Sequence, residues 1–230
     1  SKRLGNAVDP FLTIADFGPD ATRWYMISNS NPWDNLKFDI NGIEEVKRKF
    51  FGTLYNTYSF FVLYANIDKF DYSEEEIEIS IRPEIDRWIL SELNTLIKKV
   101  DDNLENYELT PAARDINDFV QEKLSNWYVR LSRRRFWKGE YNNDKVSAYQ
   151  TLYECLLNIS KLISPIAPFY SEHIFQSLNN VTNKEEFESV HISSFPLSFQ
   201  DQIDTKLENK INQIRNCLLY TSPSPRDHPR

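Results

Sequence analysis

The sequence predicts a mainly α-helical protein: an antiparallel helical bundle of long helices, preceded by a small separate element. Three observations support this fold class. Apolar residues recur three or four positions apart over long stretches, isoleucine alternation of the β type is confined to residues 77–81, and only five glycines interrupt the 230 residues. Because such spacing lines one face of a helix with apolar side chains, several of these helices bury those faces by packing side by side.

Five segments carry the helical pattern. The second and third open at prolines, which suit the first helical turn because proline has no amide hydrogen to leave unpaired. The fourth ends at a Ser-Pro pair, where the proline removes a backbone donor. The five segments span residues 43–65, 82–104, 110–131, 144–163 and 169–178.

The two ends of the chain follow different patterns. Residues 1–40 predict a loop, a short helix at 22–27 and an irregular aromatic segment, with Trp24 and Trp33 packed into the core or between elements. Near the other end, the apolar pattern predicts a helix that ends at Asn216. The run CLLYTSPSPRD that follows resembles the translation of a sequencing adapter, so we expect residues 217–230 to be a disordered artefact rather than a natural Ser/Pro-rich linker.

Composition limits the classes of function. A formal net charge of −7 argues against a partner held by overall charge, so nucleic acid would need a local basic patch. Cys155 and Cys217 lack metal-ligand or redox spacing, which indicates a reducing compartment. No apolar stretch approaches the roughly 20 residues of a membrane span, so we expect a cytoplasmic protein without a membrane partner. We identify no metal-ligand cluster and no nucleophile beside a base, and the sequence predicts no metal site.

Two basic segments are candidates for binding. The first, SKRLGNAVDP, combines Lys2 with a flexible glycine, and a lysine ammonium can meet phosphate charge, although a solvated lysine is the simpler interpretation from spacing alone. The second is NWYVRLSRRRFWKG, residues 126–139. At about 100° per residue its apolar side chains, including Leu124 and Leu131, share one face. A basic face opposite them could contact a phosphate backbone and stack a base, or could be solvated and paired with acidic neighbours. That face consists of Lys123, Arg130, Arg133, Arg134 and Trp137.

Several motifs occur together in the order found in one enzyme family. SKRLGNAVDPF, DATRWY and NPWDNLKFD are followed by LYNTYSFFVLYANID, RPEIDRWILSELN, NWYVRLSRRRFW and SPIAPFYSEHIFQSL. Together they resemble the class I isoleucyl-tRNA synthetases from the KMSKS signature onward, here in a KMSKR form without its first Lys and Met. The resemblance covers residues 1 to about 216, and it implies that the chain is a fragment.

The resemblance assigns roles to residues and regions. Lys2 matches the second signature lysine, which helps to bind ATP and stabilise phosphate charge during adenylation, and Ser1 and Arg3 match its catalytic neighbours. Residues 1–40 would be the end of the catalytic domain with its KMSKR loop and connecting segment. Residues 41–199 would be the anticodon-binding helical bundle, and residues 200–216 would begin the C-terminal region.

The family also implies partners. These are ATP with Mg²⁺, isoleucine and tRNA(Ile), with zinc in a part of the parent outside this chain and a monomeric parent. The nucleotide-binding and editing domains are likewise expected outside the chain, so we expect the fragment alone to be inactive. Two alternatives stay open: a stand-alone helical RNA-binding module, and a fragment of a valyl-type ligase.

Overall fold

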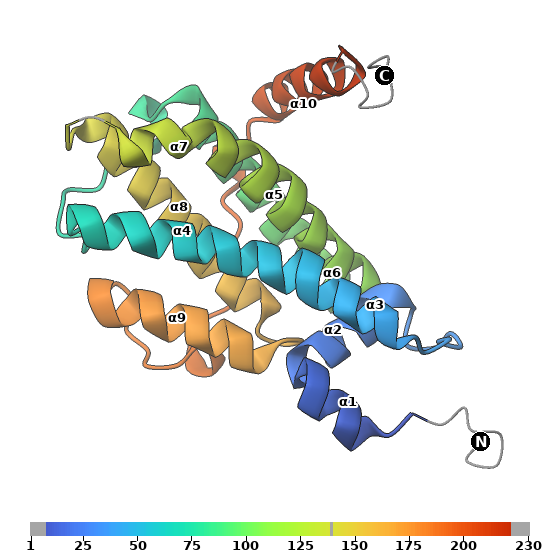
Figure 1. The fold of residues 1–230 in the computed structure, drawn as a ribbon. Helices are drawn as coiled ribbons and strands as arrows, with labels where there is room; N and C mark the ends of the chain where they lie inside the picture. Colours follow the sequence, from blue (N-terminus) through green and yellow to red (C-terminus); the bar gives the residue numbers. More distant parts are fainter. Residues whose placement is uncertain (1–7, 139, 222–230) are drawn as a thin grey trace, which may run out of the picture.

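Long helices packed side by side form the body of the protein (Figure 1). The computed structural model describes residues 8–138 and 140–221, and that part of the chain contains no β-strand. Consecutive long helices run in opposite directions, which confirms the predicted antiparallel helical bundle. The bundle helices are α3 (Ile40–Val46), η2 (Lys47–Phe51), α4 (Gly52–Asp68), α5 (Glu84–Glu105), α6 (Leu109–Asp118), η4 (Phe119–Val129), α7 (Arg130–Trp137), α8 (Asn143–Ile163) and α9 (Pro168–Thr182).

Two shorter helices precede the bundle. The prediction of a loop is wrong for the first of them, α1 (Pro10–Phe17). The Asp9 carboxylate accepts hydrogen bonds from the amides of Phe11 and Leu12, and Pro10 occupies the first turn, so an Asp-Pro pair starts the helix. Gly18, at φ 86°, ends α1 in the left-handed region and leads into α2 (Pro19–Asn29).

The core joins α2 to the bundle. Trp24 is fully buried and stacks on Phe50 with 4.2 Å between ring centroids, as predicted for a packed tryptophan. Trp33 is 65% exposed, so the expectation that it packs is wrong: it lies in the loop between α2 and α3, in a tight turn closed by Asn31 and Asp34. Since Trp24 belongs to the main core, α2 is packed as part of the bundle, while the domain boundaries inferred from the sequence stay predictions.

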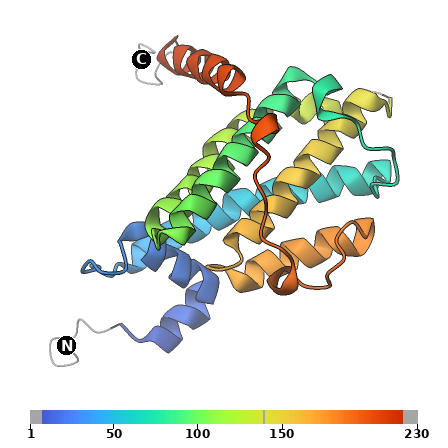
Figure 2. The same ribbon diagram turned by 180° about the vertical axis from the view of Figure 1, so that it is seen from behind.

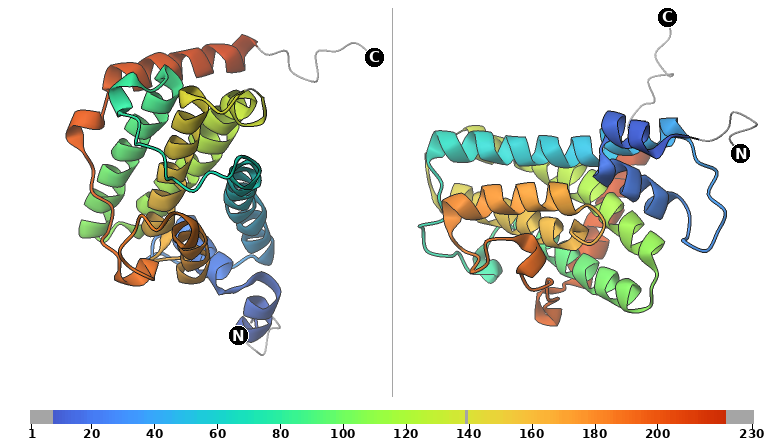
Figure 3. Two further views of the ribbon diagram at one scale, coloured as in Figure 1. Left: turned by 90° about the vertical axis from the view of Figure 1, so that its left-hand side faces the viewer. Right: turned by 90° about the horizontal axis from the view of Figure 1, so that it is seen from below.

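The end of the described chain lies along α5. After η5 (Val190–Ile192), an extended segment runs along α5 (Figure 2) and donates two hydrogen bonds to Asn94. Next come η6 (Gln200–Gln202) and α10 (Thr205–Thr221), which packs against the first half of α5 (Figure 3). The predicted helix end at Asn216 is wrong, because the next residues are compatible with a helix and the first helix-breaking proline is Pro223. None of the described helices is long and apolar enough to cross a membrane.

Candidate nucleic-acid interface

The predicted basic face lies on one continuous helix made of α6, η4 and α7. Its middle part, η4, is π-helical, with hydrogen bonds from residue i to i+5 instead of i+4. A π-helical turn holds about 4.4 residues, so each residue rotates by about 82° rather than 100°. Residues seven positions apart share a face in an α-helix, but in this winding they lie on nearly opposite sides.

Lys123 shows the effect of this winding. Its ammonium nitrogen lies 2.6 Å from a carboxylate oxygen of Glu92 in α5, a side chain that is only 2% exposed. The prediction that Lys123 shares a face with Arg130 is therefore wrong. Leu124 and Leu131 were expected on one apolar face and are separated in the same way, because Leu124 is fully buried and Leu131 is 56% exposed.

The other predicted residues are brought together on α7. Arg130, Arg133 and Arg134 are exposed, and none forms an ion pair with an acidic side chain of residues 8–138 or 140–221. Trp137, at the end of the same helix, is 57% exposed. Three unpaired guanidinium groups beside an exposed indole can contact phosphates and stack a base.

Arg135 points in the opposite direction and anchors α7. Its guanidinium donates two hydrogen bonds to the fully buried Asp86 of α5, at 2.6 and 2.7 Å. Asp86 also accepts from the Tyr128 hydroxyl at 2.9 Å and from the Ser147 hydroxyl at 2.7 Å. Burial alone would lower the pKa of Arg135, but its hydrogen bonds to Asp86 and that carboxylate's charge raise it overall. Asp86 therefore ties α7 to α5 and α8, and it is a positioning residue that sequence reasoning missed.

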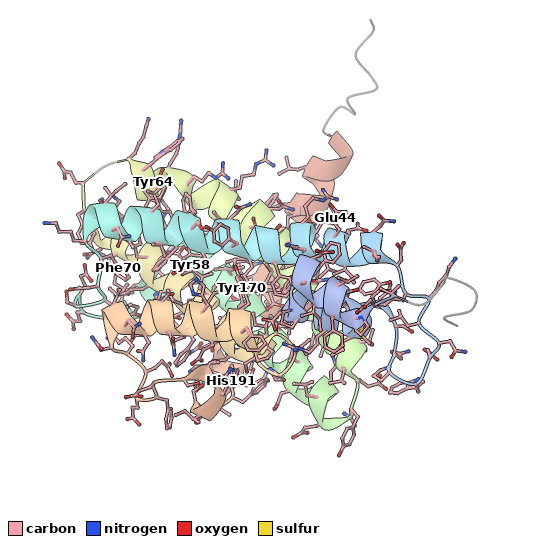
Figure 4. The ribbon with its side chains drawn as sticks, turned by 60° about the horizontal axis from the view of Figure 1, so that its bottom comes forward. Glu44, Tyr58, Tyr64, Phe70, Tyr170 and His191 are labelled. Carbon is pink, nitrogen blue, oxygen red and sulfur yellow. The ribbon has the colours of Figure 1, made fainter. Side chains whose placement is uncertain are left out.

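The predicted signature residues Ser1, Lys2 and Arg3 lie outside the described residues. Within the described part of the chain, no group of three or more histidine, cysteine or acidic side chains could hold a metal ion. His173 lies edge-on to Tyr58 between α9 and α4, and a ring nitrogen of His191 lies 3.2 Å from the Pro168 carbonyl oxygen (Figure 4). Both histidines thus have local packing partners. Cys155 is fully buried, which raises the pKa of its thiol well above the usual value.

Comparison with known proteins identifies the fold and its family. The family model for the anticodon-binding domain of tRNA ligase matches residues 86–219, more than half of the chain. The chain belongs to this anticodon-binding domain family. A solved structure with the same fold is the LeuRS agnB2 of Agrobacterium radiobacter K84 in a ternary complex with tRNA and LeuAMS, with a TM-score of 0.64 and 20% identity. The match covers 89% of this chain and 22% of that one.

Two proteins that are similar to this chain over most of its length are named isoleucine–tRNA ligase. The relative from Porphyromonas gingivalis is 64% identical over 222 residues, which cover 95% of this chain and 19% of the relative. The relative from Bacteroides thetaiotaomicron is 58% identical over 216 residues, which cover 94% of this chain and again 19% of the relative. The chain thus spans about a fifth of the length of these curated relatives. The resemblance to isoleucyl-tRNA synthetases is confirmed.

Proposed function

We propose that this chain is the part of an isoleucine–tRNA ligase that holds the anticodon side of tRNA(Ile). The observation that carries the proposal is the 58–64% identity to isoleucine–tRNA ligases across 94–95% of the chain. In this proposal, the parent enzyme activates isoleucine with ATP and transfers it to tRNA in the cytoplasm, as a monomer.

In this proposal, some residues on and around α7 contact RNA directly, and others hold α7 in position. Arg130, Arg133 and Arg134 neutralise backbone phosphates, since a guanidinium can donate two parallel hydrogen bonds to one phosphate. Trp137 offers its exposed ring to an unpaired base of a loop. Asp86 and Arg135 touch no RNA in this scheme and instead hold the backbone of α7 in place. Lys123 is left out of the interface because Glu92 already holds its charge.

The ATP-facing role rests on the signature lysine. We propose that Lys2, flanked by Ser1 and Arg3, binds ATP phosphates in the parent, with Mg²⁺ accompanying the nucleotide and zinc held outside this chain. We expect the isolated chain to form no isoleucyl-adenylate, and detectable ATP–pyrophosphate exchange by the 230-residue protein would contradict this.

The decisive experiment is tRNA binding measured over a series of salt concentrations. Isoleucine and valine tRNAs are compared for the unmodified chain and for a triple variant with Arg130, Arg133 and Arg134 changed to alanine. We expect preferential, salt-sensitive binding of isoleucine tRNA, and a slope of log affinity against log salt that falls by about two to three in the variant.

A matched control removes the same charge elsewhere. Lys98, Lys99 and Lys206 are exposed on α5 and α10, and their replacement by alanine should leave the slope nearly unchanged. Equal losses in both triple variants would show that overall charge, and not the α7 face, controls binding. Preference for valine tRNA would instead favour a valyl-type ligase.

A further inference from the structure

A polar crevice lies where α2 and α3 meet α6, at one end of the bundle. It has a volume of about 380 Å³. Figure 4 labels Glu44 on α3 at this end of the molecule. The polar side chains that line the crevice come from five elements, α2, α3, η2, α6 and η4, and they include Glu45, Lys49, Arg114, Asn117 and Gln121.

Arg114 is fixed at the rim of this crevice by hydrogen bonds that use only some of its donor groups. Its Nε donates to the Ser28 carbonyl at 2.8 Å and its Nη2 to the Asn29 carbonyl at 3.1 Å, at the C-terminus of α2. The Thr110 hydroxyl donates to the Ile27 carbonyl at 2.7 Å and fixes the same helix end to α6. A guanidinium has five N–H donors, so three of those of Arg114 form no hydrogen bond to any residue that the structure describes.

Two amide side chains add further donors. The Asn117 oxygen accepts from the indole nitrogen of Trp24 at 3.3 Å, and this sets the orientation of the amide because an indole N–H can only donate. The Asn117 amide nitrogen is therefore directed away from Trp24, and it donates to no described residue. Gln121, one turn further along, forms no side-chain hydrogen bond within the described part of the chain.

The charge of the lining suits an anion. Lys49 pairs with Glu45 at 2.5 Å, and its hydrogen bond and charge lower the pKa of that carboxylate, so the two charges offset each other. Arg114 then leaves the lining with one net positive charge, in a chain whose formal net charge is −7. Unpaired donors beside a local positive charge match the acceptor oxygens of a phosphate.

We propose that this crevice binds a backbone phosphate of the RNA that α7 contacts, a second point of attachment that rests on the proposed function. At about 4.4 residues per turn, Gln121, Asn126 and Arg130 fall in one row along the helix. Arg130 follows Gln121 by nine residues, about two turns of this helix. Phosphates follow one another at much shorter intervals along a nucleic-acid backbone, so one molecule spans both contacts.

Opposite charges introduced at Gln121 test the site. Because Gln121 has no side-chain hydrogen bond to lose among the described residues, Gln121→Glu and Gln121→Lys should both fold, and equal unfolding midpoints would verify this. Arg114 is unsuitable as the first variant because it also caps α2. We expect Gln121→Glu to weaken tRNA binding about tenfold, as for the loss of one charge-assisted hydrogen bond. Gln121→Lys should tighten binding and increase the salt slope by about one.

The outcomes separate this site from the α7 interface. Gln200, exposed on η6, supplies the control pair Gln200→Glu and Gln200→Lys, which should change binding little; its side-chain oxygen accepts a hydrogen bond from Lys98 at 3.4 Å. If tRNA binds but both Gln121 variants behave like their Gln200 counterparts, the crevice site is overturned and the α7 interface is unaffected. If the Gln121 variants change binding and the triple arginine variant does not, the crevice is supported and the α7 interface is overturned. If the unmodified chain binds no tRNA at any salt concentration, both proposals are overturned.

Discussion

Asp86 is the buried carboxylate whose loss should be most costly to this fold. It is fully buried and accepts four hydrogen bonds, two of them from Arg135, whose side chain is 15% exposed. In Asp86→Ala the guanidinium stays buried without its main partner, which typically costs about 3–5 kcal/mol. That is a large part of the roughly 5–15 kcal/mol by which a domain is stable. We therefore expect a marked loss in the free energy of unfolding.

Urea unfolding followed by circular dichroism measures this loss. Asp101→Ala, an exposed position on the same helix, is the matched control and should change stability by less than about 0.5 kcal/mol. The double variant Asp86→Ala/Arg135→Met removes the unpaired charge, so its cost should be about 1–3 kcal/mol less than the sum of the single costs. A loss below about 1 kcal/mol in Asp86→Ala, or full additivity, would refute the role assigned to this cluster.

Three further predictions follow from the packing. Gly42→Ala should destabilise by about 1–3 kcal/mol, since its Cβ would lie 2.3 Å from the Tyr25 ring. Gly52→Ala, whose Cβ would lie 3.5 Å from the Lys47 carbonyl oxygen, should be neutral or stabilising in urea unfolding. Lys123→Ala should cost about 3 kcal/mol in the same assay by leaving Glu92 unpaired, with tRNA affinity unchanged where the chain is folded. Burial raises the pKa of Tyr72, Tyr149, Tyr153 and Tyr170, so the folded state keeps these protons longer than the unfolded state does. Their stabilising contribution should be complete below about pH 10 and fall as pH rises further, and unfolding that begins well below pH 10 and follows tyrosine ionisation would contradict this.

The spacing of apolar residues predicted the helical bundle because helices with one apolar face are stable only when those faces are buried against each other. The segments predicted at 82–104 and 144–163 agree closely with α5 (Glu84–Glu105) and α8 (Asn143–Ile163). In both segments a strong apolar repeat is bounded by a proline, Pro83 before α5 and Pro165 after α8. The local signals for helix boundaries therefore agree with the packing of the whole bundle. Helix α1 was missed although Asp9 and Pro10 form a recognisable start, because the segment was interpreted as a functional loop.

The candidate site was less predictable because it depends on contacts distant in sequence. Arg135 stands in a run of three arginines, and only its pairing with Asp86, 49 residues away, distinguishes it from its exposed neighbours. Arg114 likewise gains its position from carbonyls 85 and 86 residues away in α2. Charge pairs of this kind leave no periodic signal, so composition and spacing cannot separate a structural arginine from a binding one.

The winding of η4 decides which cations of the continuous helix α6–η4–α7 face solvent. With α-helical winding throughout, Lys123 and Arg130 would share a face, and Leu131 would lie with Leu124 against the core. The π-helical segment turns Lys123 toward the buried Glu92 and turns Arg130 outward. The same rotation leaves Arg135 directed at Asp86, so the residues that hold the helix and those that face solvent occupy opposite sides. The local winding therefore directs some cations, Lys123 and Arg135, at buried carboxylates and leaves others, such as Arg130, facing solvent. For this reason a basic surface forms on a chain that is acidic overall.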